Sequence, residues 1–302
     1  MKKYTYIIMA ALLMASCDKE AGNPSQPNID PNEIRIEAAI GGTRVTGTSF
    51  DEGDTFSLFA VEYNDNEVAQ LQPAGNYLNN EVVRFNGTEW QSERAIYWSE
   101  KPCDFYGIYP YQDLLSVEGV LFEVATDQST PRTEETLGGY EASDIMWAKS
   151  QRVAREDGAV SLQFEHMMAR LVVNIERGSS YEGELPEDID VHIYNTATTA
   201  LVNWKIGSLE KYHNSPSKTI KMRRVDADSF DAIVVPQFIE RSTPLVEVTM
   251  EGIAYLLEYE MVSSHQRGKE LCEQHRRRGD GQVQSRTGSR TECGNRGYRE
   301  NT

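Results

Sequence analysis

Cys17 is the residue whose chemistry follows most directly from its neighbours. It comes after two small residues that close a short apolar run, Tyr4 to Leu13, which two lysines precede. This order of charged, apolar and small residues predicts a secretory signal over residues 1–16, and a cysteine at the cleavage point predicts acylation of its thiol. A membrane-spanning helix needs about 20 apolar residues, roughly twice the length of this run. We therefore expect a lipid anchor at Cys17.

The stretch that begins at the cysteine, residues 17–32, is rich in Pro, Asn, Ser and Gly. Such a composition buries too little apolar area to offset the chain entropy lost on folding, so it predicts a lipidated flexible tether. The acidic residues of Asp18-Lys19-Glu20 resemble the surface-export signal of lipoproteins in Bacteroides-like bacteria. The expected location is the outer surface of the cell outer membrane, with the lipid as the attachment.

The charge of the chain excludes one large class of partner. The whole chain has a formal net charge of -17, to which the signal contributes two lysines and residues 265–302 a net +4, so residues 18–264 carry -23. An acidic body of this kind repels phosphate backbones. We therefore expect no nucleic-acid partner.

Side chains that could perform catalysis are scattered along the chain. His166, His192 and His213 share no motif, and His166 lies in an apolar alternating run, where a hydrogen-bonded core histidine is expected. The sequence contains no nucleophile elbow, no Gly-rich phosphate loop and no His-Glu-x-x-His. The three cysteines that follow Cys17 have no spacing typical of a disulfide framework or a zinc site. We expect a protein without enzymatic activity, cofactor or metal.

A set of aromatic residues could bind a ligand by stacking. These residues are Trp90, Trp98, Tyr106, Tyr109 and Tyr111. Large rings with a polar tip suit a wet binding surface as well as a core. The set predicts a glycan-binding platform if its rings line one loop edge, and ordinary core packing if they point into a sheet interior.

Alternation with a period of two dominates the body of the chain and predicts β-strands. Residues 34–40 alternate between apolar and polar, and Val82 to Phe85 runs into Asn86-Gly87, the strongest short signal for a hairpin. Helical periodicity of any length is absent from the sequence. Strands separated by turns, without intervening helices, predict an all-β protein built from antiparallel sandwiches.

A polar stretch near the middle of the chain predicts a domain boundary. Residues 151–158 are mostly polar and charged and end in Asp157-Gly158, a natural linker. We therefore expect an N-terminal sandwich over residues 33–154 and a C-terminal sandwich over residues 155–264.

The run after this boundary contains a change of parity. Leu162, Phe164 and His166 share one parity, and Leu171 and Val173 share the other. A two-residue period cannot flip without an extra residue, so we expect a β-bulge or a sheet switch near residues 168–170. Leu162, Phe164 and His166 are then expected on the buried face of the first strand of the C-terminal sandwich.

Several groups of residues form a pattern by their order and spacing. They are Thr43-Arg44-Val45-Thr46-Gly47-Thr48-Ser49-Phe50 leading to Gly53-Asp54, then Ile96-Tyr97-Trp98, Asp104-Phe105-Tyr106 with Tyr109-Pro110-Tyr111, Asp144-Ile145-Met146-Trp147-Ala148, Leu162-Gln163-Phe164-Glu165-His166-Met167-Met168-Ala169-Arg170-Leu171, and Ala232-Ile233-Val234-Val235-Pro236-Gln237. No single group is specific. Together, over residues 34–260, they resemble the fimbrillin-like lipoproteins of type V pili.

The resemblance implies two sandwich domains of transthyretin-like topology and a structural or adhesive role in a pilus. Family members lose the first strand of the N-terminal domain to a protease that cuts after an arginine, and a strand from the next subunit fills the groove, which is β-augmentation. In this chain the removable strand is residues 34–40, and the cut follows Arg44 or, as second choice, Arg35. The implied partners are other pilus subunits, or ligands on host or bacterial surfaces.

Two alternatives to this assembly route stay open. In one, Arg44 is an ordinary turn arginine and the first strand stays in place, as in tip or accessory subunits. In the other, the protein is a surface lipoprotein outside any pilus, and the aromatic set described above binds glycans.

Residues 265–302 depart from the pattern. Alternation stops at His265, and Arg276-Arg277-Arg278 with repeated Gly, Gln and Ser predicts a disordered basic tail that forms no strand of a packed sheet. One choice of synonymous codons from Glu270 onward, read one nucleotide later, restores a strand-like alternation, so a frameshift near Lys269 is one explanation of the tail. A basic tail that binds a polyanion is the other.

Overall fold

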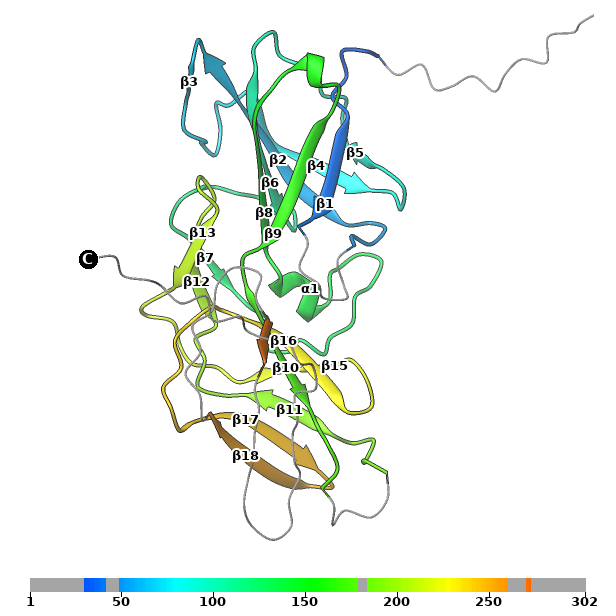
Figure 1. Ribbon diagram of the computed structural model, residues 1–302, viewed down its shortest axis with the longest axis vertical. Helices are drawn as coiled ribbons and strands as arrows, with labels where there is room; N and C mark the ends of the chain where they lie inside the picture. The colour runs from blue at the N-terminus through cyan, green and yellow to red at the C-terminus, as the bar shows by residue number, and fades with distance from the viewer. Residues whose placement is uncertain (1–29, 42–48, 179–183, 260–269, 273–302) are drawn as a thin grey trace, which may run out of the picture.

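The computed structural model describes residues 30–41, 49–178, 184–259 and 270–272. Within these ranges the ordered elements are strands, apart from a short helix, α1 (Gly139–Ser143), and a 3-10 turn, η1 (Arg155–Asp157). The all-β class predicted from the alternation is therefore confirmed. Figure 1 shows the strands in two bodies stacked along the long axis of the molecule, an upper body that contains β1 and a lower body that contains β18.

The upper body is one sheet that closes on itself. Its strands lie in the order β3, β2, β4, β5, β1, β9, β8, β6, and β6 also pairs with β2, which completes a ring. Most neighbours are antiparallel, but β1 and β9 are parallel. The strands are β1 (Ile36–Ile40), β2 (Thr55–Asn64), β3 (Glu67–Val68), β4 (Leu78–Phe85), β5 (Trp90–Ser92), β6 (Cys103–Tyr109), β8 (Met146–Val153) and β9 (Val160–His166).

The lower body contains three smaller sheets. Their orders are β15-β16-β10-β19, β14-β11-β17-β18 and β13-β12-β7. The strands are β7 (Val120–Glu123), β10 (Ala169–Asn174), β11 (Asp190–Ile193), β12 (Thr199–Asn203), β13 (Ser208–Lys211), β14 (Ile220–Lys221), β15 (Arg223–Arg224), β16 (Ser229–Val234), β17 (Thr243–Met250), β18 (Ile253–Tyr259) and β19 (Glu270–Cys272).

Strands β2 and β6 are buried on both faces. On β2, Phe56 and Leu58 belong to the core of the upper body, whereas Phe59 and Val61 belong to the core of the lower body. All seven residues of β6 are buried. A strand covered on both sides needs apolar residues at successive positions, which explains why these two strands alternate less clearly than the others. The two bodies therefore share a continuous apolar contact.

Strand β9 corrects the predicted domain boundary. It pairs with β1 and β8, and its residues Leu162 and Phe164 are buried in the core of the upper body. Residues 151–158 therefore lie in a hairpin of the upper body instead of a linker. The expected sheet switch does occur, because β9 ends at His166 and β10 begins at Ala169 in a different sheet. The upper body extends to His166 instead of ending at residue 154.

A second departure from the predicted division concerns residues 110–145, which were expected in the N-terminal sandwich. Strand β7 lies in this segment and pairs with β12 of the lower body. The fully buried side chain of Gln128 donates a hydrogen bond to the carbonyl of Ile233 and accepts one from its N–H, both at 2.7 Å. Residues 110–145 therefore belong to the lower body, and the chain re-enters the upper body at β8.

Strand β19 corrects the prediction for the tail. Glu270, Leu271 and Cys272 were expected to form no strand, yet their backbone pairs in parallel with Arg170, Leu171 and Val172 of β10. A sheet edge with unpaired N–H and C=O groups favours any segment that can satisfy them, whatever its side chains. The rest of the predicted tail lies outside the described residues.

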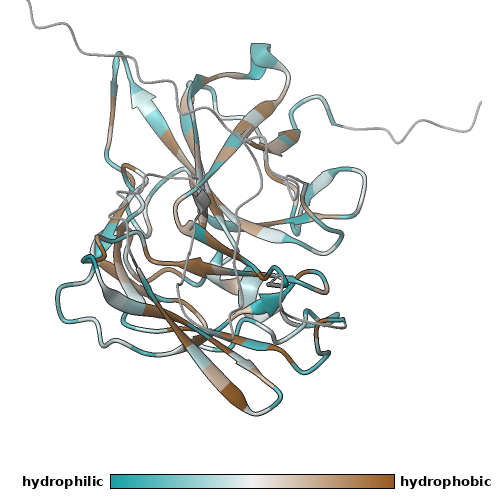
Figure 2. Ribbon diagram, turned by 60° about the horizontal axis from the view of Figure 1, so that its bottom comes forward, coloured by the Kyte–Doolittle hydropathy of each residue, from teal (hydrophilic) through white to brown (hydrophobic). Residues whose placement is uncertain are grey.

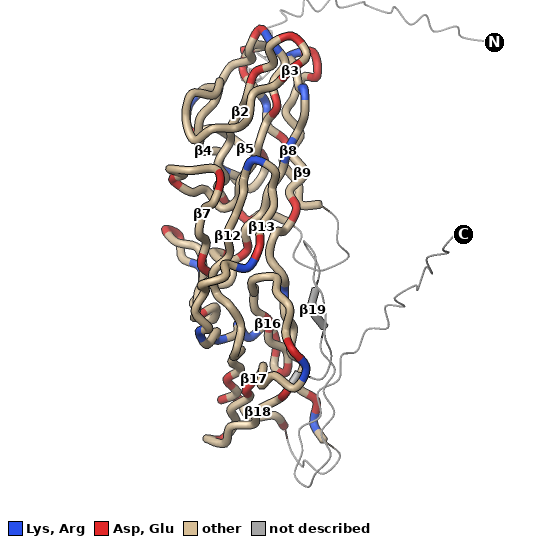
Figure 3. Tube along the Cα trace, turned by 90° about the vertical axis from the view of Figure 1, so that its left-hand side faces the viewer, with Lys and Arg blue, Asp and Glu red and all other residues tan. Residues whose placement is uncertain are grey.

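Hydropathy and charge follow this architecture. Figure 2 shows apolar residues, in brown, concentrated in the strands, and hydrophilic residues, in teal, concentrated in the connecting loops. Figure 3 shows that the Lys, Arg, Asp and Glu residues lie largely at turns and at the rims of the sheets. The core is therefore formed by the alternating apolar residues from which the strands were predicted.

The packing around Phe164 yields the first prediction. Phe164 is fully buried, and its ring lies 5.1 Å from the ring of Phe56, centre to centre. Phe164→Ala should lower the free energy of unfolding by about 3–5 kcal/mol, as large-to-small changes in packed cores do. Denaturant melts measure this loss, with the exposed neighbour change Gln163→Ala as the control. Equal losses for the two variants would contradict the register of β9.

A second prediction concerns His166, whose Nδ1 lies 2.9 Å from Oδ1 of Asp144. Burial lowers the pKa of His166, but the hydrogen bond and the charge of Asp144 more than offset this, so the pKa is raised above 6.5. A raised folded-state pKa means that protonated His166 stabilises the fold fully below the unfolded pKa, and that this contribution is lost as pH rises through the folded pKa. The free energy of unfolding should therefore fall as pH rises through and above 6.5.

The control for this pH series is His166→Gln, which cannot titrate. The difference in unfolding free energy between parent and variant should shrink as pH rises, because other titrating groups cancel in the comparison. A difference that is constant between about pH 6 and pH 8 would show that the charge of His166 contributes nothing to stability.

Candidate functional site

Strand β1 lies between β9 and β5 in the sheet. We call this position, with the apolar residues packed beneath it, the β1 seat. On one side it pairs with β9 in parallel along its whole length, from Ile36 opposite Val160 to Ile40 opposite Phe164. On the other side its pairing with β5 is a single position, Ile36 opposite Trp90. The strand is therefore held mainly by one neighbour, although it completes the ring of the upper body (Figure 1).

The side chains of this segment divide cleanly between the two faces. Ile34 and Ile36 are buried in the core of the upper body, and Ala38 and Ile40 are half-buried and pack against it. The intervening residues are all exposed, and they are Arg35, Glu37 and Ala39. The alternation predicted for residues 34–40 is confirmed, and the apolar face is the one turned inward.

Aromatic rings form the floor beneath β1. The rings of Phe50 and Trp90 have centres 4.8 Å apart at 87°, and those of Phe56 and Trp90 lie 4.8 Å apart at 61°. Phe164 lies 5.6 Å from Phe50. Edge-to-face contacts of this kind add to the energy of apolar burial and fix ring orientation. The floor is therefore a packed cluster contributed by β2, β5, β9 and the segment before β2.

Hydrogen bonds fix both ends of the strand. Ahead of β1, the N–H of Ile34 donates to the carbonyl of Ile96 at 2.8 Å, and that of Val160 donates to the carbonyl of Arg35 at 2.8 Å. After β1, the N–H of Gly41 donates to the carbonyl of Phe164 at 2.6 Å. These contacts use backbone atoms only, so they depend on an extended chain and not on its side chains.

An indole group completes the open flank of the seat. Where pairing with β5 has ended, the Nε1–H of Trp90 donates to the carbonyl of Ala38 at 3.3 Å. The two residues are 52 positions apart in the sequence. No local sequence signal could have revealed this contact, and the sequence left Trp90 open between a surface platform and core packing.

The predicted cleavage and lipidation residues differ in what can be said of them. Arg35 is exposed, but its carbonyl is bonded to β9, as described above, and it precedes β1. Arg44 and Cys17 lie outside the described residues, so their predicted roles stay predictions. No helix in the described ranges is long and apolar enough to span a membrane.

The aromatic set packs mainly in the cores, which is one of the two arrangements that the sequence left open. Trp90, Tyr106 and Tyr109 are buried in the cores, and Trp98 is half-buried against the same apolar cluster. Tyr109 donates a hydrogen bond to Asp54, and burial together with the charge of Asp54 raises the pKa of its hydroxyl. Rings held inside a sheet cannot stack on a sugar, so core packing accounts for these four residues. The fifth residue of the set, Tyr111, is half-buried.

Other candidate sites are weak. The three histidines lie apart, and no group of three or more His, Cys, Asp or Glu side chains in the described part of the chain could hold a metal. Burial and the nearby charge of Glu62 raise the pKa of the Cys103 thiol to about 12, which disfavours the reactive thiolate. The seat of β1 is thus the most distinctive feature of the described structure.

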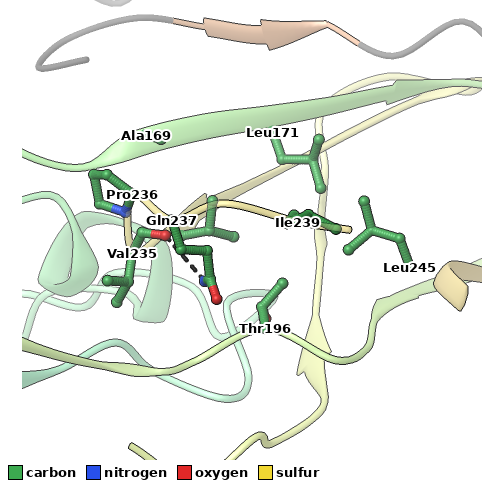
Figure 4. Close-up of a pocket in the computed structure, with 9 residues that line it drawn as sticks. Ala169, Leu171, Thr196, Val235, Pro236, Gln237, Ile239 and Leu245 are labelled. Carbon is green, nitrogen blue, oxygen red and sulfur yellow. Dashed lines mark hydrogen bonds between the residues drawn. The ribbon is translucent and has the colours of Figure 1, made fainter. Parts of the chain in front are cut away.

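A cavity beneath β10 is lined mainly by apolar side chains, as Figure 4 shows. Ala169 and Leu171 of β10 lie on one side, and Gln237 hydrogen-bonds to the backbone on another. Its volume of about 10 Å³ corresponds to about one water molecule. This cavity is too small for an organic ligand.

Comparison with known proteins decides the family. Residues 43–271 match the family model described as Fimbrillin-like. The chain belongs to the fimbrillin-like family. The match begins just after β1 and includes the rest of the upper body, with β9, and the strands of the lower body up to β19. No curated protein matches this chain.

Two crystal structures share the fold of this fimbrillin-like chain. A candidate cell adhesion protein from Bacteroides uniformis has 19% sequence identity and a TM-score of 0.58, covering 86% of this chain and 98% of its own. A candidate cell adhesion protein from Bacteroides ovatus has 14% identity and a TM-score of 0.58, covering 80% of this chain and 98% of its own. At these identities the likeness concerns the fold.

Proposed function

We propose that this protein is a structural or adhesive pilus component at the cell surface, which assembles when its first strand is removed and replaced by a strand of another subunit. The observation that carries the proposal is the seat of β1. One parallel neighbour, β9, makes nearly all its strand pairing, and an aromatic cluster lies beneath it. The family membership and the two adhesion proteins with the same fold support a role of this kind.

The position of the arginines relative to β1 favours Arg44 as the cut site. A cut after Arg35 leaves residues 36–40, the whole of β1, attached to the body. It also requires a protease to extract a peptide bond whose carbonyl is hydrogen-bonded to Val160. A cut after Arg44 frees β1 at its carboxyl end, so that only non-covalent contacts hold it.

Loss of β1 would leave a gap that a second strand can fill. The N–H and C=O groups of β9 and the apolar floor would both lose their partner, and unpaired edges are templates for strand addition. A donor strand from the carboxyl-terminal region of a neighbouring subunit fits the route that the family resemblance implies. The partners of this protein are thus other pilus subunits, with surface ligands as the targets of an adhesive member.

Attachment to the outer membrane through lipid on Cys17 completes the proposal. Before the cut, a single lipidated tether holds the acidic, all-β body at the membrane. The cut after Arg44 and the loss of β1 then release the body, because Cys17 lies on the removed side. The glycan-binding alternative loses its basis because its aromatic residues are largely buried, as described above. We assign no enzymatic reaction, and the protein acts by binding.

The cut site can be tested with two variants. Full-length protein is treated with an arginine-specific protease, and the released fragments are identified by mass spectrometry. Arg44→Lys should abolish release of a fragment that contains β1, while Arg35→Lys should leave it unchanged, because only the first change removes the bond that frees the strand. The reverse pattern, with Arg35 essential, would exclude Arg44.

The anchor can be tested independently of assembly. Metabolic labelling with a fatty acid should mark the parent protein and leave Cys17→Ala unlabelled, because the thiol is the acyl acceptor. The variant should also move from the membrane fraction to the soluble one. Cys103→Ala is the matched control, and it should be labelled as strongly as the parent. Equal labelling of Cys17→Ala would refute the lipid site.

A further inference from the structure

We propose that Trp90 selects the strand that occupies the β1 seat, by binding one backbone carbonyl with its indole N–H and by restricting the side chain at that position. The proposal deepens the proposed function and rests on it, because it describes how the vacated seat would choose a new occupant. It assigns Trp90 a positioning role and defines the pattern of the incoming strand.

The first step of the argument is the shape of the ladder. Strand β5 offers β1 only one paired position, Ile36 opposite Trp90, before β5 and β1 separate. Two residues further along β1, the carbonyl of Ala38 accepts the indole N–H of the same Trp90 at 3.3 Å. A side chain thus replaces the missing backbone donor of β5. The contact extends the ladder by one rung and specifies which carbonyl of the occupant lies there.

The second step is the rigidity of the indole. Trp90 is 8% exposed and its ring contacts three others, with centres 4.8 Å from Phe50, 4.8 Å from Phe56 and 5.1 Å from Phe85. None of these rings belongs to β1, so the cluster that orients Trp90 does not depend on the strand it binds. A buried N–H group that loses its acceptor is costly. The empty seat would therefore retain a donor in place for a new carbonyl.

The third step is the side chain beside this carbonyl. Ala38 has the same parity as Ile36 and Ile40 and packs against the upper core, yet it is the small residue of the three. The indole nitrogen lies 3.3 Å from the carbonyl of Ala38, so a larger side chain at this position would compete with the ring for the space beside the strand. The side chain of the next residue, Ala39, lies on the opposite face of the strand and is exposed. The restriction is therefore specific to one position.

These steps define the occupant as an extended segment of a second polypeptide that runs parallel to β9. Apolar residues are required at the places of Ile36 and Ile40, and a small residue at the place of Ala38. The outward positions tolerate most side chains, as Glu37 and Ala39 already indicate. Backbone pairing with β9 supplies affinity, and the pockets for alternate side chains supply specificity.

The first experiment uses the intact, uncleaved full chain. Native-state hydrogen exchange is followed at the amides of Val160 and Gly41, which are bonded across β1 and β9. Trp90→Phe keeps an aromatic ring and loses the N–H, so exchange at these amides should rise about fivefold, the effect of one neutral hydrogen bond. The matched control is Trp147→Phe, which loses an indole bond of 2.8 Å to the carbonyl of Trp204 instead.

Amides of β10 report global stability in the same experiment. Faster exchange confined to the β1 amides in Trp90→Phe, and absent in Trp147→Phe, supports the role of Trp90. If the amides of Val160 and Gly41 exchanged at the same rate in Trp90→Phe as in Trp147→Phe, the proposed role of Trp90 would be overturned. This readout needs no cleavage, so failure of the proposed assembly route and failure of the role of Trp90 are distinguishable.

The second experiment tests the selection of the occupant. Full chain cut after Arg44 is mixed with a fluorescent peptide of residues 33–41, and exchange into the seat is followed by anisotropy. A peptide with Ala38→Leu should bind at least tenfold more weakly than the unmodified peptide, whereas Ala39→Leu should bind like it. Equal weakening by both changes, or by neither, would overturn the position-specific restriction. Absence of any cut after Arg44 would instead count against the proposed function.

Discussion

Parallel pairing between β1 and β9 closes the sheet of the upper body, and the remaining structure depends on that closure. A closed sheet has no free edge, whereas an open one presents a row of unpaired N–H and C=O groups. Between β5 and β9 some strand must therefore be present, with apolar residues turned toward Phe56, Trp90 and Phe164. The requirement concerns an alternating extended segment and not a particular stretch of this chain. A strand from another chain can meet the same requirement, and this is the physical basis of the proposed strand replacement.

The lower body supports the upper one through interlocked segments. Residues 110–145 leave the ring and contribute β7 to a sheet of the lower body. The indole N–H of Trp147, on β8 of the upper body, donates a hydrogen bond to the carbonyl of Trp204 in the lower body. A Cβ added at Gly207 would lie 2.2 Å from the Trp147 ring. Gly207, with a φ of +59°, is therefore required by both space and backbone conformation. These contacts join β8, the strand next to β9, to the lower body.

Local patterns predicted a large part of this fold. Alternation predicted the strands, and Asn86-Gly87 predicted the turn between β4 and β5, where Gly87 has a φ of +89°. The change of parity after His166 predicted the sheet switch that separates β9 from β10. These predictions succeed because the side-chain period of a strand and the backbone needs of a tight turn are properties of neighbouring residues.

The sequence by itself determined the class of the protein, the inward face of residues 34–40 and the family resemblance. Only the tertiary structure decided that β9 pairs with β1, that Trp90 is a buried donor to Ala38 and that Glu270–Cys272 can pair with β10. A polar stretch looks the same whether it is a linker or a hairpin, and a tryptophan looks the same on a surface or in a core. Partners distant in sequence choose between these outcomes, because burial and strand pairing are satisfied only when the whole chain has folded.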